Sequence, residues 1–244
     1  MPEDPTTRLD KYLSGLGFAS RRKVADFLAA HHVTINSKRT TDPGSRFTPG
    51  TDQLLLDGKP LVPVANNPEY FILNKPPGVV STTAPQAGET TVTDLVNSKT
   101  RLFPVGRLDK ESTGLILLTN DGDLTFKLTH PKFHIPKVYR AVVAGKPTFR
   151  QLMLLRAGVR LKDARTKPAR VDKIASDDSS TTLAITISEG RHHQIRRMCA
   201  GINLHLISLK RIAVGPLTLG DLPLGQFRPL TAQELKLLKS TPEN

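Results

Sequence analysis

The chain lacks tryptophan, has a single cysteine, and contains no apolar run long enough to cross a membrane. A membrane-spanning helix needs about 20 consecutive apolar residues, so we do not expect a membrane protein or a membrane partner. With Cys199 alone, neither an intrachain disulfide nor a cysteine-based zinc site can form. Residues 1–7 show neither the basic nor the apolar region of a secretory signal. We therefore expect a cytoplasmic protein in a reducing compartment.

Acidic residues are few relative to basic ones. The chain of 244 residues has 35 Lys and Arg against 22 Asp and Glu, a formal net charge of +13. A surplus of this size favours a polyanionic partner, although charge alone also fits a protein that is simply basic. A membrane-surface protein is less well supported, because no basic helix carries Trp or Phe on its apolar face. Walker and dinucleotide-binding motifs are also missing, so no nucleotide cofactor is expected.

Residues 1–62 have the pattern of a small separate domain. Residues 7–10 have the form of a capping box, and Ser20 is placed to cap a second helix. Short strands are expected at residues 33–36 and 53–58. The first helix is predicted by one apolar stripe, formed by Leu9, Tyr12, Leu13 and Leu16.

A basic cluster opens the second predicted helix. Arg21, Arg22 and Lys23 lie in its first turn, where cations oppose the helix dipole at a cost of about 0.3–1 kcal/mol each. A phosphate would offset that cost by accepting from free backbone N–H groups and from the basic side chains. Arg8 and Lys11, three residues apart, would extend the same face. The alternative is a solvated face with no ligand.

At these residues the segment resembles the small α-L RNA-binding domain first described in a ribosomal small-subunit protein. The matching strings are Arg8-Leu9-Asp10, Ser20-Arg21-Arg22, Val33-Thr34-Ile35-Asn36 and Asp57-Gly58. The family usually has glycine before the strand, whereas this chain has His31-His32. We interpret that pair as surface residues, because no third metal ligand lies near it in sequence. The resemblance implies RNA contacts by Arg8, Lys11, Ser20, Arg21, Arg22 and Lys23.

The remainder, residues 69–244, follows a proline- and asparagine-containing linker at residues 63–68. Strands are expected at residues 70–73, 115–119, 138–143 and 182–187, and helices at residues 150–156, 192–200 and 232–239. Strands with helices between them, without a strict alternation, indicate an α+β fold with a largely antiparallel sheet.

The most specific string of the chain is Gly106-Arg107-Leu108-Asp109-Lys110-Glu111-Ser112-Thr113-Gly114-Leu115. Its terminal glycines allow a tight loop close to a ligand, and Asp109 lies within that loop. Arg107 and Lys110 would favour the ionised carboxylate, which can act as a nucleophile or a general base. The spacing is equally compatible with a turn residue in a salt bridge with Arg107.

This string resembles the catalytic motif of the RsuA-type family of ribosomal RNA pseudouridine synthases. Further resemblances follow in order at residues 73–78, 119–122, 137–139, 189–198, 209–217 and 225–230. Together with the N-terminal domain they cover nearly the whole chain. In the family the aspartate of Arg-Leu-Asp is essential, which falls on Asp109, and the tyrosine that packs on the target base falls on Tyr139. The family implies neither a metal nor a cofactor.

The resemblance also suggests roles around Asp109. Arg196 is expected to fix its carboxylate by a bidentate pair. Leu108 and Ile195 are candidate apolar walls for the base, although core packing explains them equally well. Lys75, Arg107 and Arg197 are further candidates for substrate binding. His192 and His193 are interpreted as polar or RNA-facing residues, and Cys199 as a core residue.

The function implied is isomerisation of uridine to pseudouridine in a ribosomal RNA stem-loop. The target base would have to leave its helix for this chemistry. Large-subunit RNA is favoured over small-subunit RNA by a likeness at residues 166–167 and 195–199 to large-subunit members. The alternative is a non-catalytic RNA-binding or ribosome-assembly factor of the same fold. We expect the protein to act as a monomer.

Overall fold

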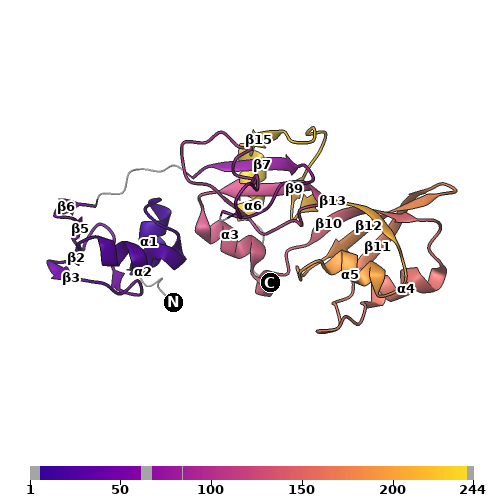
Figure 1. Cartoon of the computed structure of the whole chain (residues 1–244), viewed down its shortest axis with the longest axis horizontal. Coiled ribbons are helices and arrows are strands. Elements are labelled where there is room, and N and C mark those ends of the chain that lie inside the picture. Colours follow the sequence, from indigo (N-terminus) through magenta and orange to yellow (C-terminus); the bar gives the residue numbers. More distant parts are fainter. Residues whose placement is uncertain (1–5, 62–67, 84, 241–244) are drawn as a thin grey trace. The chain divides into compact units, whose positions relative to one another are not determined.

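The computed structural model describes residues 6–61, 68–83 and 85–240 (Figure 1). Contacts group these residues into two compact units, one within Met1–Pro68 together with Lys99–Arg101, the other formed by Glu69–Ser98 and Leu102–Asn244. The linker predicted at residues 63–68 lies, except for Pro68, outside the described residues. Each unit has its own apolar core.

The first unit contains two short helices and small sheets. Its helices are α1 (Leu9–Gly15) and α2 (Val24–Ala30), the latter preceded by a single 3₁₀ turn, η1 (Arg21–Lys23). β3 (Lys38–Arg39), β2 (Val33–Ile35), β5 (Leu54–Leu56) and β6 (Lys59–Pro60) form an antiparallel sheet in that order. The helices and strands predicted here are therefore present, and Leu9, Leu13, Leu28 and Val33 are fully buried in their core.

The predicted caps of this unit are wrong. Residues Thr7–Arg8 form strand β1, which pairs with β4 (Arg46–Phe47), so the chain enters α1 from a strand. Neither Arg8 nor Ser20 makes a side-chain capping bond. Asp10 instead accepts hydrogen bonds from the guanidinium groups of Arg8 and Arg21, because a buried carboxylate requires charged partners.

The second unit is built on a sheet whose strand order is β11-β12-β10-β13-β9-β7-β15. Its pairings are antiparallel except that between β13 and β9, which is parallel. The strands are β7 (Tyr70–Lys75), β9 (Thr113–Thr119), β10 (Lys137–Ala144), β11 (Arg170–Ser176), β12 (Ser180–Ile187), β13 (Leu206–Val214) and β15 (Phe227–Pro229). Short β8 (Phe103–Pro104) and β14 (Leu217–Thr218) pair with β9 and β13. The predicted α+β fold with a largely antiparallel sheet is confirmed.

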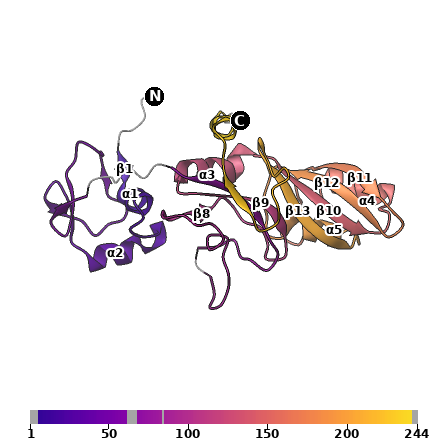
Figure 2. The ribbon, with the colours of Figure 1, turned by 90° about the horizontal axis from the view of Figure 1, so that it is seen from above.

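Helices cover both faces of this sheet. α4 (Phe149–Ala157) and α5 (Gln194–Ala200) lie beside β10 to β12, whereas α3 (Gly122–Thr129) and α6 (Ala232–Lys239) lie beside β7 and β9 (Figures 1 and 2). Consecutive residues of β9 therefore enter different cores: Ile116 packs with the α4 and α5 side, and Leu117 with the α3 and α6 side. This double burial explains why residues 115–118 of β9 are all apolar instead of alternating with polar ones.

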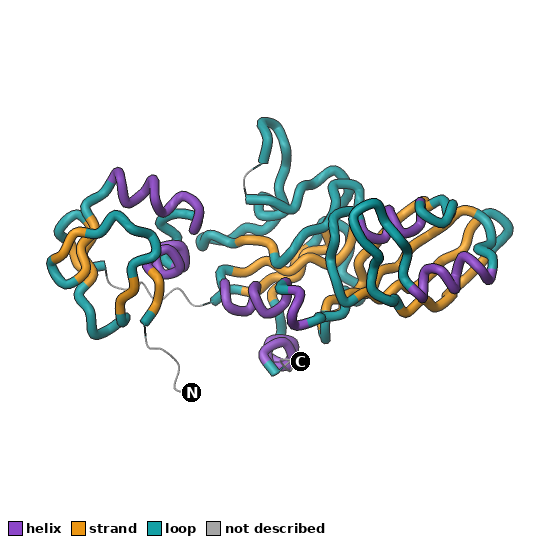
Figure 3. Tube along the Cα trace, turned by 90° about the horizontal axis from the view of Figure 1, so that it is seen from below, coloured by secondary structure: helices purple, strands orange, loops and turns teal. Residues whose placement is uncertain are grey.

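Several elements of this unit were not predicted from the sequence, among them β13 and α3. β13 has charged residues at Lys210 and Arg211, yet it pairs with β10 on one side and β9 on the other. α3 begins at Gly122, a residue that suggests a turn, but Asp121 caps the helix by accepting from two backbone N–H groups. The predicted strands and the helices α4, α5 and α6 are present. Figure 3 shows loop over the described part of residues 76–98, between β7 and β8.

Candidate active site

Asp109 lies in the loop between β8 and β9, and the glycines at both ends of this loop have backbone angles that favour glycine. Gly106 has a φ of +75° and Gly114 a φ of +104°. A Cβ atom at Gly114 would stand 2.2 Å from the carbonyl oxygen of Arg211. This crowding arises because Gly114 is paired with Arg211 in the parallel β9–β13 register. Any larger residue at position 114 would push the loop that carries Asp109 away from β13.

The loop backbone on the N-terminal side of Asp109 is held by two side chains from distant segments. Nη1 of Arg211 donates to the carbonyl oxygen of Arg107 at 3.2 Å. Oγ of Ser81 donates to the carbonyl oxygen of Leu108 at 3.1 Å and accepts from the Leu108 N–H at 3.2 Å. The peptide groups on both sides of Leu108 therefore have fixed partners.

On the C-terminal side, Lys75 lies beneath the loop. Its side chain is fully buried, and Nζ donates to the carbonyl oxygens of Pro76 at 2.8 Å and Lys110 at 3.0 Å. The Lys110 carbonyl also accepts from the Gly78 N–H at 2.9 Å. Burial lowers the pKa of Lys75 to about 8. The predicted role of Lys75 in substrate binding does not match this position, because its ammonium group is directed to loop carbonyls.

The Asp109 carboxylate has three polar neighbours. Oδ2 accepts from Nε of Arg196 at 3.2 Å and from Oγ of Ser112 at 3.3 Å, and Nε2 of His193 lies 3.5 Å from Oδ1. The bidentate pair predicted for Arg196 is wrong, since its Nη2 donates to Ser112 Oγ at 3.1 Å. A salt bridge to Arg107 is not among the ion pairs found for the described residues.

A cavity of about 320 Å³ opens beside Asp109. Among the predicted site residues, those lining it are Arg107, Leu108, Asp109, Tyr139 and Ile195. Leu108, Tyr139 and Ile195 are buried members of the apolar core as well as lining the cavity, so core packing of Leu108 and Ile195 is confirmed, whereas their role as walls for the base stays a prediction. The cavity thus combines a carboxylate, an aromatic ring and apolar walls, which suits a planar base.

Arg197 lies outside this group. Its guanidinium contacts the Asp163 carboxylate and the carbonyl oxygen of His192. Asp163 also lies 3.8 Å from Nη1 of Arg191. Arg197 is therefore an anchor for the loop that carries Asp163, and its contact with substrate stays a prediction.

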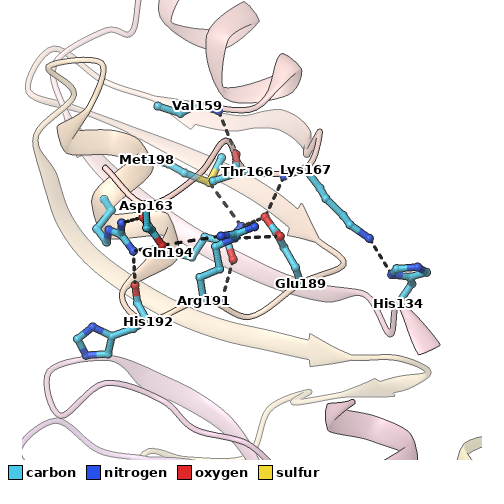
Figure 4. Close-up of polar contacts among 11 residues, drawn as sticks. His134, Val159, Asp163, Thr166, Lys167, Glu189, Arg191, His192, Gln194 and Met198 are labelled. Carbon is cyan, nitrogen blue, oxygen red and sulfur yellow. Dashed lines mark hydrogen bonds and ion pairs between the residues drawn. The ribbon is translucent and has the colours of Figure 1, made fainter. Parts of the chain in front are cut away.

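Glu189 is a site residue that sequence reasoning missed, and Figure 4 shows its contacts. Its carboxylate accepts from the backbone N–H of Lys167 at 2.9 Å, from Nε2 of Gln194 at 2.7 Å and from Nε of Arg191 at 3.2 Å. These bonds join the loop after α4 to the start of α5, the helix that carries Arg196. The contacts with Arg191 and Gln194 are local, whereas that with Lys167, 22 residues away, has no local sequence pattern to signal it.

Two cations of the cavity, the half-buried Lys137 and the buried Arg211, were also missed. Lys137 and Arg211 line the cavity, from β10 and β13 respectively. Burial, followed by the nearby charge of Arg211, lowers the pKa of Lys137 to about 8. The alternation of β10 offers a signal for Lys137, because it lies two residues before Tyr139 and so on the same face.

In the first unit, the predicted basic residues fall into two classes. Arg8 and Arg21 form ion pairs with Asp10, at 3.1 and 2.9 Å. Arg22 and Lys23 are exposed and show no ion pair within the described residues. Lys11 is also exposed, whereas Ser20 is half-buried at the start of η1. Two residues of the basic cluster, Arg8 and Arg21, thus pair with the buried carboxylate of Asp10.

The described residues form neither a metal site nor a membrane-spanning helix. These contain no group of three or more His, Cys, Asp or Glu side chains placed to hold a metal ion. None of the helices described is both long and apolar enough to span a membrane. Cys199 is buried and free, as the sequence predicts, and burial raises the pKa of its thiol to about 11.

Comparison with known families identifies both parts of the chain. The model of the family described as RNA pseudouridylate synthase matches residues 69–201, and that of the S4 domain matches residues 7–52. The chain belongs to the RNA pseudouridylate synthase family. The predicted resemblance is confirmed, and the enzyme is an isomerase with an N-terminal S4 domain.

Relatives and a solved structure match along nearly the full length. Ribosomal large subunit pseudouridine synthase B of Bacillus subtilis is 40% identical over 236 residues, which cover 96% of each chain. Dual-specificity RNA pseudouridine synthase RluF of Escherichia coli is 37% identical, over 96% of this chain and 79% of the relative. A crystal structure of a pseudouridylate synthase superimposes with a TM-score of 0.68 at 30% identity, over 95% of this chain and 99% of the other.

Proposed function

We propose that this synthase isomerises a specific uridine of ribosomal RNA, with large-subunit RNA favoured, and that Asp109 is its catalytic carboxylate. The observation that carries the proposal is the position of Asp109, which lies at the cavity wall with its carboxylate held by Arg196 and Ser112. The name of the Bacillus subtilis relative supports the choice of large-subunit RNA. We further propose a stem-loop target, action as a monomer and a cytoplasmic location.

The domain roles follow from this proposal. The S4 domain, within residues 1–62, binds RNA phosphates through its basic cluster, and residues 69–244 carry out the chemistry. The target uridine leaves its helix and enters the cavity, because its glycosidic bond is otherwise inaccessible. There Tyr139 provides a stacking surface, a contact worth about 1–3 kcal/mol per base. Leu108 and Ile195 bound the base on its apolar edges.

Arg196 and Ser112 act on the carboxylate and not on the base. A guanidinium hydrogen bond orients the Asp109 carboxylate and limits its rotation. The carboxylate is then placed to attack the nucleotide or to remove a proton from it. Arg107 lies exposed at the same cavity, where its charge suits the phosphate of the flipped nucleotide.

The decisive experiment is Asp109→Asn, with tritium release from RNA labelled at uracil carbon five as the measure of turnover. Asn keeps the shape of the side chain and loses its charge, so turnover should vanish while RNA binding persists. The matched control is Glu111→Gln, the same change two residues later on an exposed side chain. An Asp109→Asn rate within tenfold of wild type would refute the catalytic role.

The RNA target requires a separate measurement. Sequencing of modified uridines in a deletion strain should reveal one ribosomal position that loses pseudouridine, within large-subunit RNA. Loss in small-subunit or transfer RNA would correct the target without affecting the catalytic assignment. If the wild-type protein releases no tritium from ribosomal or transfer RNA, the alternative of a non-catalytic assembly factor replaces the proposal.

A further inference from the structure

Two cations line the wall of the cavity on which the base would rest. Lys137 and Tyr139 lie two residues apart on β10, and their side chains therefore project from the same face of the sheet. Arg211 on β13 is directly opposite Tyr139 in the register of the two strands. All three line the cavity together with Asp109. A base stacked on Tyr139 would therefore have both cations close to its edge.

Neither cation has a carboxylate partner among the described residues. Nζ of Lys137 donates to the carbonyl oxygen of Ile135 at 3.0 Å. Arg211 donates through Nε to the carbonyl oxygen of Leu115 at 2.8 Å and through Nη1 to that of Arg107 at 3.2 Å. Its third nitrogen, Nη2, is buried and has no hydrogen-bond partner.

The carboxylates that line the same cavity are engaged elsewhere. Asp109 is bonded to Arg196 and Ser112, and Glu189 to Arg191 and Gln194. Lys137 and Arg211 thus place positive charge in a largely buried site without a local counter-charge. Such an arrangement costs free energy in the free enzyme, and it favours any bound group that carries negative charge.

The isomerisation itself generates a negative group at this place. When the bond between C1′ of the ribose and N1 of uracil breaks, the electron pair leaves with the base. The charge is then shared by N1 and the two carbonyl oxygens. A new bond forms between C1′ and C5, the hydrogen of C5 departs as a proton, and N1 gains a proton. The balance needs no oxidant or reductant. If Asp109 instead adds to C6 of the base, the electron pair moves to C5 and to the carbonyl oxygen at C4, so one of the same two oxygens receives the charge.

We propose that Lys137 contacts a carbonyl oxygen of the target uracil and, with the buried charge of Arg211 behind it, stabilises the negative charge that the base acquires during isomerisation. Preorganised charge directed at a developing anion is among the largest contributions to enzymatic rates. Lys137 would then be a catalytic residue and Arg211 a supporting charge. The inference rests on the proposed function, since it requires uridine as substrate.

The test compares two bases in the same RNA, with uridine or 5-fluorouridine at the target position. Fluorine at C5 withdraws electrons, so the base bears negative charge more readily and depends less on an external cation. Fluorine cannot leave C5 as a proton does, so with 5-fluorouridine the reaction stops once the bond between C1′ and C5 has formed. Single-turnover loss of the target nucleoside, separated from its isomer by chromatography because the two have the same mass, gives the rate for each base. Lys137→Met should slow uridine about 100-fold, a typical effect of removing one charge-stabilising donor, but slow 5-fluorouridine tenfold or less.

Two controls separate this role from a structural one. Lys137→Arg keeps the charge and should stay within tenfold of wild type on uridine, with RNA affinity unchanged in both variants. Equal losses on the two bases, or a loss confined to RNA affinity, would overturn the proposal. Wild-type turnover of uridine is measured in the same series. The absence of wild-type turnover would reject the proposed function itself. If the wild type turns over but Lys137→Met slows uridine and 5-fluorouridine equally, only the role of Lys137 is rejected.

Discussion

Arg196 and Asp109, 87 residues apart in the chain, are joined by a hydrogen bond of 3.2 Å between Nε and Oδ2. Ser112 closes a triangle with them, because its Oγ donates to Oδ2 and accepts from Nη2 of Arg196. The carboxylate is thus held from two directions, by a helix and by its own loop. This arrangement fixes the carboxylate more firmly than a single ion pair in solvent would.

We expect Arg196→Lys to lower the single-turnover rate about tenfold or more, because lysine keeps the charge but cannot contact Oδ2 and Ser112 through a planar group. Ser112→Ala should cause a smaller loss, since Arg196 remains bonded to the carboxylate. RNA affinity should stay unchanged in both. Arg197→Lys is the matched control, because its guanidinium contacts Asp163 instead. Equal losses for Arg196→Lys and Arg197→Lys would argue for a general effect on α5.

Tyr139→Phe should be milder than Tyr139→Ala if stacking is the main role of this residue. Phe keeps the ring and loses only the hydroxyl group, whereas Ala removes the surface on which the base rests and leaves a cavity. Single-turnover rates and melting temperatures of both variants decide the matter. Equal large losses with unchanged melting temperatures would show that the hydroxyl group takes part in proton transfer. A drop mainly in melting temperature for Ala would indicate core packing.

The sequence predicts the fold and the candidate site to different extents. Local apolar patterns predicted α6 and the central strand β9, the helix by its spacing and the strand by a continuous apolar run. β13 was missed because two of its residues, Lys210 and Arg211, are charged. The guanidinium of Arg211 is buried against carbonyl groups of another strand and a loop, a tertiary contact that overrides the polar character of the residue.

At the site, the resemblance to a family placed Asp109, Tyr139 and Arg196 around one reaction, and the structure brings the three residues close to one cavity. It did not reveal that Lys75 lies beneath the loop, since a lysine beside a glycine-proline turn looks like a surface residue. Glu189 is a comparable case, because it accepts from the backbone of Lys167 in the loop after α4, 22 residues away. A hydrogen bond of this kind leaves no local periodicity to detect.

Lys75 should make the stability of the protein depend on pH in the alkaline range. Burial lowers its pKa from 10.5 to about 8 in the folded protein, so between these values the unfolded chain binds more protons than the folded one. The free energy of unfolding therefore rises with pH in this window, by up to about 3 kcal/mol from this group. Lys75→Met should remove that part of the rise.

Urea denaturation at intervals from pH 7 to pH 10.5 tests this expectation. The informative quantity is the slope of the free energy of unfolding against pH, and not its absolute value. The absolute value also falls in Lys75→Met, because two loop carbonyls lose their donor. Lys137→Met is an informative companion, since its lysine has a similarly lowered pKa and should account for another part of the rise. Parallel curves for wild type and Lys75→Met would contradict the assigned pKa.

The basic residues of the S4 domain should separate into RNA ligands and structural partners. Arg22 and Lys23 are exposed without ion pairs in the described structure, whereas Arg21 is bonded to the buried Asp10. We expect the double variant Arg22→Ala, Lys23→Ala to bind RNA more weakly with an unchanged melting temperature. Each lost phosphate contact should reduce the slope of log affinity against log salt by about 0.7–0.9.

Arg21→Ala should behave differently, because it removes one of the two guanidinium partners of Asp10 and leaves a buried carboxylate less satisfied. Its melting temperature should fall, and any loss of RNA affinity would follow from that. Asp10→Asn is the matching change on the acid side and should rescue part of the stability of Arg21→Ala, since an amide tolerates burial better than an unpaired charge. Filter binding over a salt series measures RNA affinity for these variants, and single-turnover rates at saturating RNA are measured in parallel.

The double variant Arg22→Ala, Lys23→Ala should leave the saturated single-turnover rates unchanged, because the phosphate contacts bring the RNA to the enzyme and the carboxylate in the other domain does the chemistry. Unchanged affinity and salt slope in the double variant would remove Arg22 and Lys23 from the RNA-binding surface.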